Sequence, residues 1–261
     1  MSILKHELKQ GSRSFIIWTA SISFFLIICI LMFPEIKGEM EGISEMFASM
    51  GSFSAAFGMD RLNFGTLKGF YSVECGNILG MGGAFFASLI AVTALAKEEK
   101  EHTAEFLFSH PISRFRVVSE KLLAVMLRIV TMNVIIWALS AAAIVVIGEK
   151  IPFKEILLLH IAYTLLQIEL AGICFCLSAF LQRGSIGIGL GIAAALYFLN
   201  IVANINERAD FLKYITPFGY TEGADIIENG SLDFILILIG MAYAVIGIAI
   251  AYIKYSKKDL R

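Results

Sequence analysis

Charged side chains that could bind a partner are concentrated in one part of the sequence, Ala96 to Lys121, here called the charged segment. It holds ten of the 43 Asp, Glu, Lys and Arg residues of the chain and two of its four histidines. On a helical wheel, one face of this segment carries four polar residues: Glu98, Glu101, His102 and Glu105. Three consecutive large apolar residues follow them: Phe106, Leu107 and Phe108. An apolar edge beside a charged face is typical of a surface that contacts another protein or lipid headgroups.

Two residues indicate where the helix of the charged segment ends and where the next helix begins. Pro111 interrupts the helical pattern, and Ser113 is placed to cap the helix that follows. That second helix is expected to start with the basic stretch Arg114 to Lys121. A simpler interpretation is a solvated loop whose long charged side chains anchor at the membrane surface. The three apolar residues before Pro111 favour a docking surface instead.

A second group of polar residues lies inside long apolar runs. Glu169 stands near the middle of one run, where an ionised side chain in a bilayer would cost about 2.5 kcal/mol or more. It must therefore be protonated, paired, or exposed to a wet cavity. We predict a translocation path with five candidate residues: Glu169, Gln167, His160, Asn133 and Asn200. The alternative for each is a hydrogen bond between helices with a structural role only.

The sequence contains no motif for catalysis or metal binding among those searched. The phosphate loop GxxxxGK[ST], the zinc motif HExxH and the nucleophile elbow GxSxG are absent. The four cysteines lie within apolar runs or at the edge of one, which is typical of small apolar packing residues. We therefore predict no catalytic residue, no metal site and no cofactor in this chain. Any energy source must lie in another chain or in an ion gradient.

The composition places these residues in a membrane protein. Hydrophobic residues make up 58% of the chain and charged residues 16%, and the mean hydropathy is +0.79. A bilayer core about 30 Å thick needs about 20 apolar residues per helix. Six runs qualify: Phe15–Phe33, Tyr71–Ala96, Leu122–Ile147, Ile156–Leu181, Ile186–Ala203 and Phe234–Tyr255. Because these runs are continuous rather than alternating, they predict a single all-α domain with six transmembrane helices.

The distribution of Lys and Arg in the short flanks predicts the orientation of the chain. Basic residues fall in residues 1–14, in the charged segment and in the tail from Lys254 to Arg261, whereas acidic residues predominate in 34–70 and 204–233. Both termini and the charged segment are therefore predicted to be cytoplasmic. Residues 204–233 are predicted to be extracellular. Residues 1–14 are predicted to form an amphipathic elbow helix on the membrane surface before the first span.

The charged segment resembles the signature of the permease subunits of ATP-binding-cassette (ABC) exporters of the ABC-2 class. The matching residues are an acidic start at Glu98, then Thr103, Glu105, Leu107, Pro111, Ser113, Arg114 and the downstream Lys121. His102 stands where the family usually has Gly. The resemblance implies a type V ABC exporter-like fold in the plasma membrane of a bacterial cell. It also implies that residues 98–110 form a coupling helix, which docks on a separate ATPase subunit and carries signals through Glu98, Glu101, His102, Thr103, Glu105, Phe106, Leu107, Phe108, Pro111, Ser113 and Arg114.

Several partners follow from the resemblance. The ATP and Mg would bind the ATPase subunit rather than this chain. A second permease chain, identical or related, would complete the membrane part, and no nucleic acid is expected. Glycines that recur at helical spacing mark faces for close packing, within the chain or between two chains: Gly76, Gly80 and Gly83, and Gly184, Gly187 and Gly191. The few ionisable groups in the spans favour a hydrophobic or amphipathic cargo, such as a peptide, a drug or a lipid, moved out of the cell.

Two other classes of function remain possible from the sequence. An ion-coupled secondary transporter would use Glu169 as a proton or sodium site, but it should show internal repeats or broken helices, and no convincing similarity between the halves is found. A membrane anchor or sensor subunit that transports nothing is the other alternative. Co-purification of an ATPase would separate an exporter subunit from both.

Overall fold

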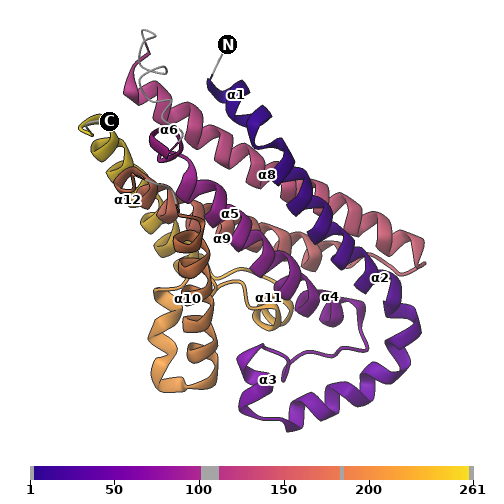
Figure 1. Cartoon of the computed structure of the whole chain (residues 1–261). Coiled ribbons are helices and arrows are strands. Elements are labelled where there is room, and N and C mark those ends of the chain that lie inside the picture. Colours follow the sequence, from indigo (N-terminus) through magenta and orange to yellow (C-terminus); the bar gives the residue numbers. More distant parts are fainter. Residues whose placement is uncertain (1–2, 101–111, 183–184, 259–261) are drawn as a thin grey trace.

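The computed structural model describes residues 3–100, 112–182 and 185–258, and within these ranges the chain contains helices and no strand. Six helices in the described part are long and apolar enough to cross a membrane. The predicted all-α fold with six candidate spans is therefore confirmed. Helix α1 (Ile3–Gln10) and the last turn of α12 (Phe234–Ser256) lie at the same end of the bundle, close to the short helix α6 (Lys97–Lys100) (Figure 1). The assignment of that end to the cytoplasm stays a prediction from the charge distribution.

The first span is longer than its apolar run. Helix α1 (Ile3–Gln10) is followed at Gly11 by α2 (Ser12–Ser49), of which 12–39 is the candidate span. The sequence predicts an exit at Phe33, before Pro34, but α2 continues through that proline. A proline ends a helix only where the lost hydrogen bond is not outweighed by packing. Here the later turns are held by contacts such as that between Phe47 and Phe64, whose ring centroids are 5.3 Å apart.

The second span is built from three helical segments in series. Helix α4 (Leu67–Cys75) leads into a π-helical segment, η1 (Gly76–Met81), and then into α5 (Gly82–Thr93). The first glycine stripe lies on this span and packs within the chain. A Cβ atom at Gly80 would lie 2.9 Å from a ring carbon of Tyr163, and one at Gly83 would lie 2.1 Å from the amide of Gln167. These glycines therefore let the second span approach the fourth.

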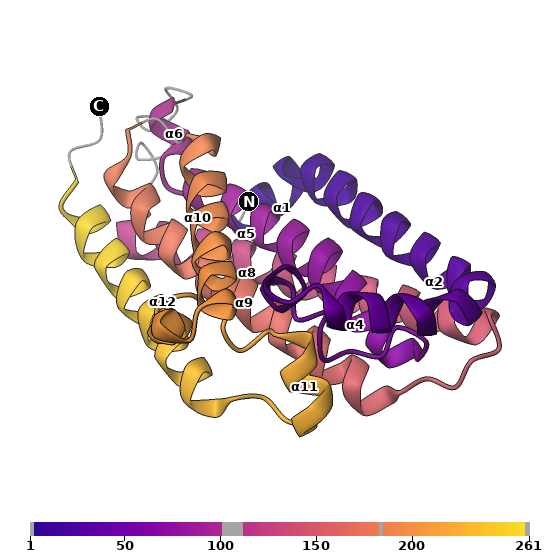
Figure 2. The ribbon, with the colours of Figure 1, turned by 90° about the horizontal axis from the view of Figure 1, so that it is seen from below.

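The remaining spans are α8 (Arg114–Val146), α9 (Phe153–Phe180), α10 (Ile186–Ile205) and α12 (Phe234–Ser256). Helix α9 is central, because it packs against α5, α8 and α12. Helices α2 and α12 lie at opposite edges of the bundle (Figures 1 and 2). In the second glycine stripe, a Cβ atom at Gly191 would meet no described atom within 4 Å, and one at Gly187 would meet only a hydroxyl at 3.7 Å, while Gly184 lies outside the described residues.

Three short helices gather at the end of the bundle opposite the termini. Helix α3 (Ser52–Ala56) follows α2 and contacts α10. The segment between α10 and α12 forms a 3-10 helix, η2 (Glu207–Tyr214), and the helix α11 (Gly223–Asn229). Helix α11 packs against α4 and α9. The two acid-rich segments of the sequence, 34–70 and 204–233, therefore meet at one end of the molecule (Figure 1).

Candidate functional site

The predicted coupling residues lie mostly outside the described part of the chain. Glu101, His102, Thr103, Glu105, Phe106, Leu107, Phe108 and Pro111 fall in the undescribed range 101–111. Glu98 lies in α6, and only its backbone is described. The structure places the remaining two coupling residues, Ser113 and Arg114. The Ser113 hydroxyl accepts a hydrogen bond from the Arg116 N–H at 3.3 Å and so caps α8, as expected for a serine at this position.

Arg114 and its surroundings tie the charged segment to the last span. The Arg114 guanidinium donates to the backbone carbonyls of Tyr255, at 3.2 Å, and of Lys258, at the end of α12. These carbonyls have few partners within a helix, and a cation is favourable near them. On the other side of the segment, Lys258 forms an ion pair of 2.9 Å with Glu99 of α6 and donates to the Leu181 carbonyl at 2.8 Å. Both flanks of the charged segment are thus attached to spans.

Lys121 joins three helices at this end of the bundle. Its side chain is 1% exposed, and its ammonium group donates to the Glu7 carboxylate of α1 at 2.9 Å and to the Ala94 carbonyl, just after α5, at 2.8 Å. Burial favours a higher pKa for Glu7, but the charge and hydrogen bond of Lys121 outweigh it and hold the pKa of Glu7 below its usual value of 4.5. The neighbouring Glu120 accepts from the Leu4 N–H at 2.8 Å. The lysine of the signature is therefore a structural anchor for α1.

The predicted path residues within the membrane form separate hydrogen-bonded pairs. The Asn133 amide donates to the Gln167 side-chain oxygen at 2.7 Å, which joins α8 to α9. His160 Nε2 lies 2.7 Å from the Tyr71 hydroxyl, which joins α9 to α4. Asn133, Gln167 and His160 are all buried, at 4%, 0% and 4% exposure. These are hydrogen bonds between helices, as expected if the residues have a structural role only. Each of the three side chains still leaves one buried polar atom without a partner among the described residues, such as Gln167 Nε2.

Glu169 lies on another side of α9, away from these pairs. It is 1% exposed, and its Oε1 accepts a hydrogen bond of 2.8 Å from the Tyr220 hydroxyl. Its carboxylate lies against Gly240 of α12, where a Cβ atom would come within 2.1 Å of Oε2. Glu169 is therefore paired with a neutral group, and Gly240 leaves the space that it fills.

Asn200 lies elsewhere, in the wall of a small polar cavity that we call the outer cavity. This cavity has a volume of about 60 Å³ and is lined mainly by residues of α4, η1, α9, α10 and the segment around Glu222. Tyr163, 3% exposed, donates to the Thr221 carbonyl there at 3.2 Å. Asn200 Oδ1 is buried without a partner in the described structure. A volume of this size is large enough for water, since a cavity needs about 10 to 15 Å³ to admit one molecule, and the polar lining suits it.

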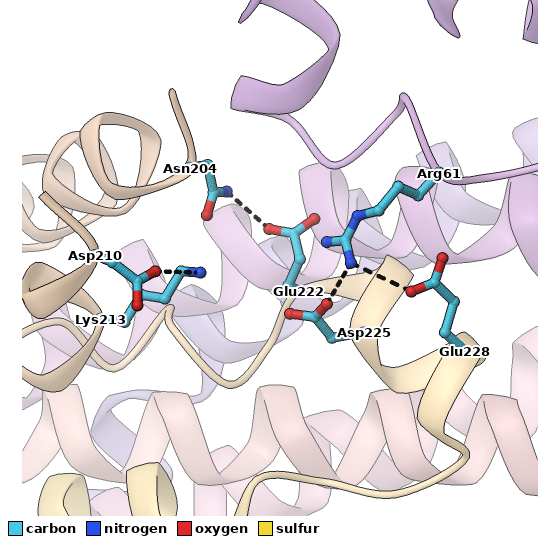
Figure 3. A network of polar contacts seen from close by, with 7 residues as sticks. All are labelled: Arg61, Asn204, Asp210, Lys213, Glu222, Asp225 and Glu228. Atoms are coloured by element: carbon cyan, nitrogen blue, oxygen red, sulfur yellow. Dashed lines mark hydrogen bonds and ion pairs between the residues drawn. The ribbon is translucent and has the colours of Figure 1, made fainter. Parts of the chain in front are cut away.

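A network of charged residues lies beside the outer cavity and shares Glu222 with its lining (Figure 3). Arg61, in the loop after α3, pairs with Asp225 at 2.7 Å and with Glu228 at 3.3 Å, both on α11. Glu222 points between this group and Asn204, whose amide donates to it at 2.9 Å (Figure 3). We call the contact of the loop after α3 with 222–228 the outer seal.

Glu222 is the titratable group at the centre of the outer seal. Burial raises the pKa of Glu222 to about 6, against the lowering effect of the hydrogen bond from Asn204. Gly58, with φ of +62°, packs directly on this carboxylate, where a Cβ atom would lie 1.6 Å from Oε1. Only a glycine fits both the left-handed backbone and the space.

Several of these residues were not predicted from the sequence. Tyr71 and Tyr220 supply the partners of His160 and Glu169, but a tyrosine beside apolar residues looks like an ordinary packing residue. Glu74 is a second acid within a span, and it accepts a contact of 3.5 Å from the Cys29 thiol. Its place inside the span Leu67–Thr93 could have been found, because a carboxylate there is as costly as at Glu169.

Comparison with known proteins agrees with this architecture. The model of a family described as ABC-2 family transporter protein matches residues 1–260. The uncharacterized protein YhcI of Bacillus subtilis (strain 168) is similar to this chain, with 23% identity over 215 residues, which are 73% of this chain and 68% of that protein. Members of this family are membrane subunits for transport rather than catalytic subunits. The six-span chain, with its charged segment between the second and third spans, therefore belongs to the ABC-2 family of transporter proteins.

Proposed function

We propose that this chain is the permease subunit of an ATP-driven exporter, in which a separate ATPase moves the charged segment and thereby the spans. The observation that carries the proposal is the attachment of both flanks of that segment. Glu99 is paired with Lys258, and Arg114 is bonded to carbonyls at the end of α12. A force applied between these two points would act on α8 and α12 directly.

The chemistry of the segment suits docking on another protein. Leu107 and Phe108 provide an apolar edge that a groove on the ATPase would bury, and Glu101 and Glu105 provide charges for basic groups at the rim. Closure of two ATPase subunits on ATP would then bias the permease between two packings of similar energy. Two permease chains are needed to match two ATPase subunits.

The interior of the bundle supports a hydrophobic or amphipathic cargo. The buried polar side chains of the spans are mostly uncharged, such as Asn133 and Gln167, which bond to each other, so a small hydrophilic ion would find little charge to replace its hydration shell. The outer cavity and outer seal lie where cargo would leave the protein. In this proposal the seal opens in the outward-facing state, with separation of Arg61 from Asp225 and Glu228.

Substitutions at Glu105, Leu107 and Phe108 of the charged segment test whether this segment docks on an ATPase subunit. Leu107→Ala with Phe108→Ala removes apolar surface worth about 1.5 to 3 kcal/mol per side chain if it is fully buried. Glu105→Lys places a charge of the wrong sign at the rim. These variants should reach the membrane and stay monodisperse, but retain less ATPase subunit on purification from the native host and fail to stimulate its turnover. Phe53→Ala, which removes an exposed aromatic from α3 at the other end, is the matched control.

Three outcomes would contradict the proposal. Unchanged ATPase retention and transport in all coupling variants would make the segment a solvated loop. Transport that continues without ATP, and that follows a proton or sodium gradient instead, would identify an ion-coupled transporter. A chain that binds the ATPase but shows no cargo movement in vesicles would be an anchor or sensor subunit.

A further inference from the structure

A second cavity lies at the end of the bundle that carries the termini, between α1, the start of α2, α5 and α8. It has a volume of about 220 Å³, and we call it the basic cavity. Three cationic side chains line it, Lys97, Lys121 and Arg128, with Glu7 as the one acid among its described lining residues. Its other walls are mostly apolar, with Leu89, Ile90 and Val125. It belongs neither to the predicted path nor to the outer cavity.

Arg128 is the cation of the basic cavity whose hydrogen bond brings it no carboxylate. Glu7 is engaged by Lys121 at 2.9 Å, and both groups are nearly inaccessible, with side-chain exposures of 11% and 1%. Arg128 donates to the backbone carbonyl of Glu7, and its Nε is buried with no hydrogen-bond partner in the described structure. A backbone carbonyl brings no full negative charge, so the guanidinium charge is not neutralised by the contacts of Arg128 itself. A cationic cavity with a buried N–H to satisfy is suited to an oxyanion.

The backbone is shaped to hold the guanidinium at this place. A Cβ atom at Gly11 would lie 2.1 Å from an Arg128 Nη atom and 2.3 Å from its Cζ. The break between α1 and α2 therefore falls where a glycine leaves room for the guanidinium, and α1 is held over it by Lys121. A guanidinium fixed in this way can offer its remaining N–H groups to the oxygens of a phosphate.

We propose that the basic cavity binds the phosphate group of an anionic phospholipid from the adjacent leaflet. A free phosphate offers the same oxyanion, but the cavity combines basic groups with an apolar wall of Leu89, Ile90 and Val125, which suits the start of an acyl chain. Its position also fits a headgroup. Lys97 follows the second span, and Lys121 and Arg128 lie in the first half of α8, which at 33 residues is about 50 Å long and extends beyond a bilayer core of about 30 Å. Basic pockets between transmembrane helices are known to take anionic headgroups.

The test measures lipid binding by the purified full-length chain and does not depend on the ATPase. The protein is placed in nanodiscs of phosphatidylcholine with increasing phosphatidylglycerol, and retained lipid is counted by native mass spectrometry. Arg128→Gln should weaken phosphatidylglycerol retention about tenfold, the effect of a lost charge-assisted hydrogen bond. Lys97→Gln should weaken it in the same direction and leaves in place the Glu7–Lys121 ion pair and the hydrogen bond of Arg128 to the Glu7 carbonyl. Lys9→Gln, which removes an exposed charge from α1, is the matched control and should change nothing.

The outcomes separate the lipid from other sources. If Arg128→Gln does not fold, Lys97→Gln decides alone, with phosphatidylcholine retention as the measure of an intact protein. Equal phosphatidylglycerol retention in wild type, Arg128→Gln and Lys97→Gln would overturn the proposal. Inorganic phosphate that stabilises the wild type in phosphatidylcholine as well as phosphatidylglycerol does would assign the cavity to a soluble anion and overturn the lipid assignment.

Discussion

The pair of Glu7 and Lys121 gives the sharpest test of how this fold is held together, because both groups are buried and each comes from a different helix. At a distance of 2.9 Å, their attraction is about 6 kcal/mol with an effective dielectric constant of 20. Desolvation offsets much of this, so the net value of the pair is small, whereas removal of one partner leaves a buried charge. We predict that Lys121→Met or Glu7→Gln alone lowers the free energy of unfolding by about 3 kcal/mol. The double variant should lose only about 1 kcal/mol, because neither member of this ion pair is left buried without the other.

The assay is a double-mutant cycle in a neutral detergent with zwitterionic lipid, so that no anionic lipid compensates a Lys121 that has lost Glu7. Stability is read from thermal unfolding, and the docking of α1 from hydrogen exchange of its amides. Lys9→Met, at an exposed position on α1, is the matched control. The wild type should also respond to acid. The folded pKa of Glu7 is lowered, so the stabilisation is present above about 4.5 and is lost as the pH falls below that value.

The result that would refute this reasoning is additivity. If the double variant loses the sum of the two single losses, Glu7 and Lys121 contribute independently and the ion pair does not anchor α1. Loss of stability without faster exchange in α1 would also contradict it, because the pair would then stabilise something other than the docking of that helix.

Two further predictions concern the other carboxylates of the site. The pKa of Glu222 is raised from 4.5 to about 6, so its ionised form is disfavoured by about 2 kcal/mol, and the outer seal should tighten as the pH falls from 7.5 to 5. This tightening should appear as slower hydrogen exchange of the α11 amides, and Glu222→Gln should abolish its pH dependence. A pH dependence that survives this substitution would exclude Glu222 as its source. Glu169→Gln keeps an acceptor for the Tyr220 hydroxyl and should change the free energy of unfolding by less than about 1 kcal/mol, whereas Glu169→Leu leaves that hydroxyl unpaired and should cost about 1 to 3 kcal/mol. Equal losses of stability in both variants would show that the charge matters rather than the hydrogen bond. Normal export by Glu169→Gln would remove Glu169 from the translocation path.

The spans could be predicted from the sequence because each needs an apolar run of fixed length, and six such runs exist. The ends of most spans could not be predicted, since a helix continues wherever its backbone groups find hydrogen-bond partners, whatever the bilayer thickness. Helix α2 passes Pro34, where the sequence predicts an exit. The start of α8 is an exception: the helix begins at Arg114, eight residues before the apolar run at Leu122, and the sequence predicts this start from the Ser113 cap.

The candidate site was predictable only as separate residues. A carboxylate or amide inside a span indicates that a partner exists, but not which residue it is, since Tyr71 is 89 positions from His160 and Tyr220 is 51 from Glu169. Glu222 could not be singled out, because it is one of many acids in its segment and its burial depends on Gly58 and Asn204, which are distant in the sequence. The anchoring role of Lys121 was equally hidden, as a lysine at the end of a span normally reaches toward water.

The π-helical turn in the second span has a consequence for how this protein can change through evolution or design. In an α-helix each residue advances the side-chain direction by about 100°, and a π turn accommodates one extra residue without unwinding the rest. Helix α4 and helix α5 both bury residues against α9, although a single α-helical phase does not run through them. If Gly76–Met81 became a regular α-helix without losing a residue, the extra residue would rotate one half of the span against the other by about 100°. Such a rotation would turn either Tyr71 away from His160 or Gly83 away from Gln167, so the π turn lets the span carry one more residue while both contacts are kept.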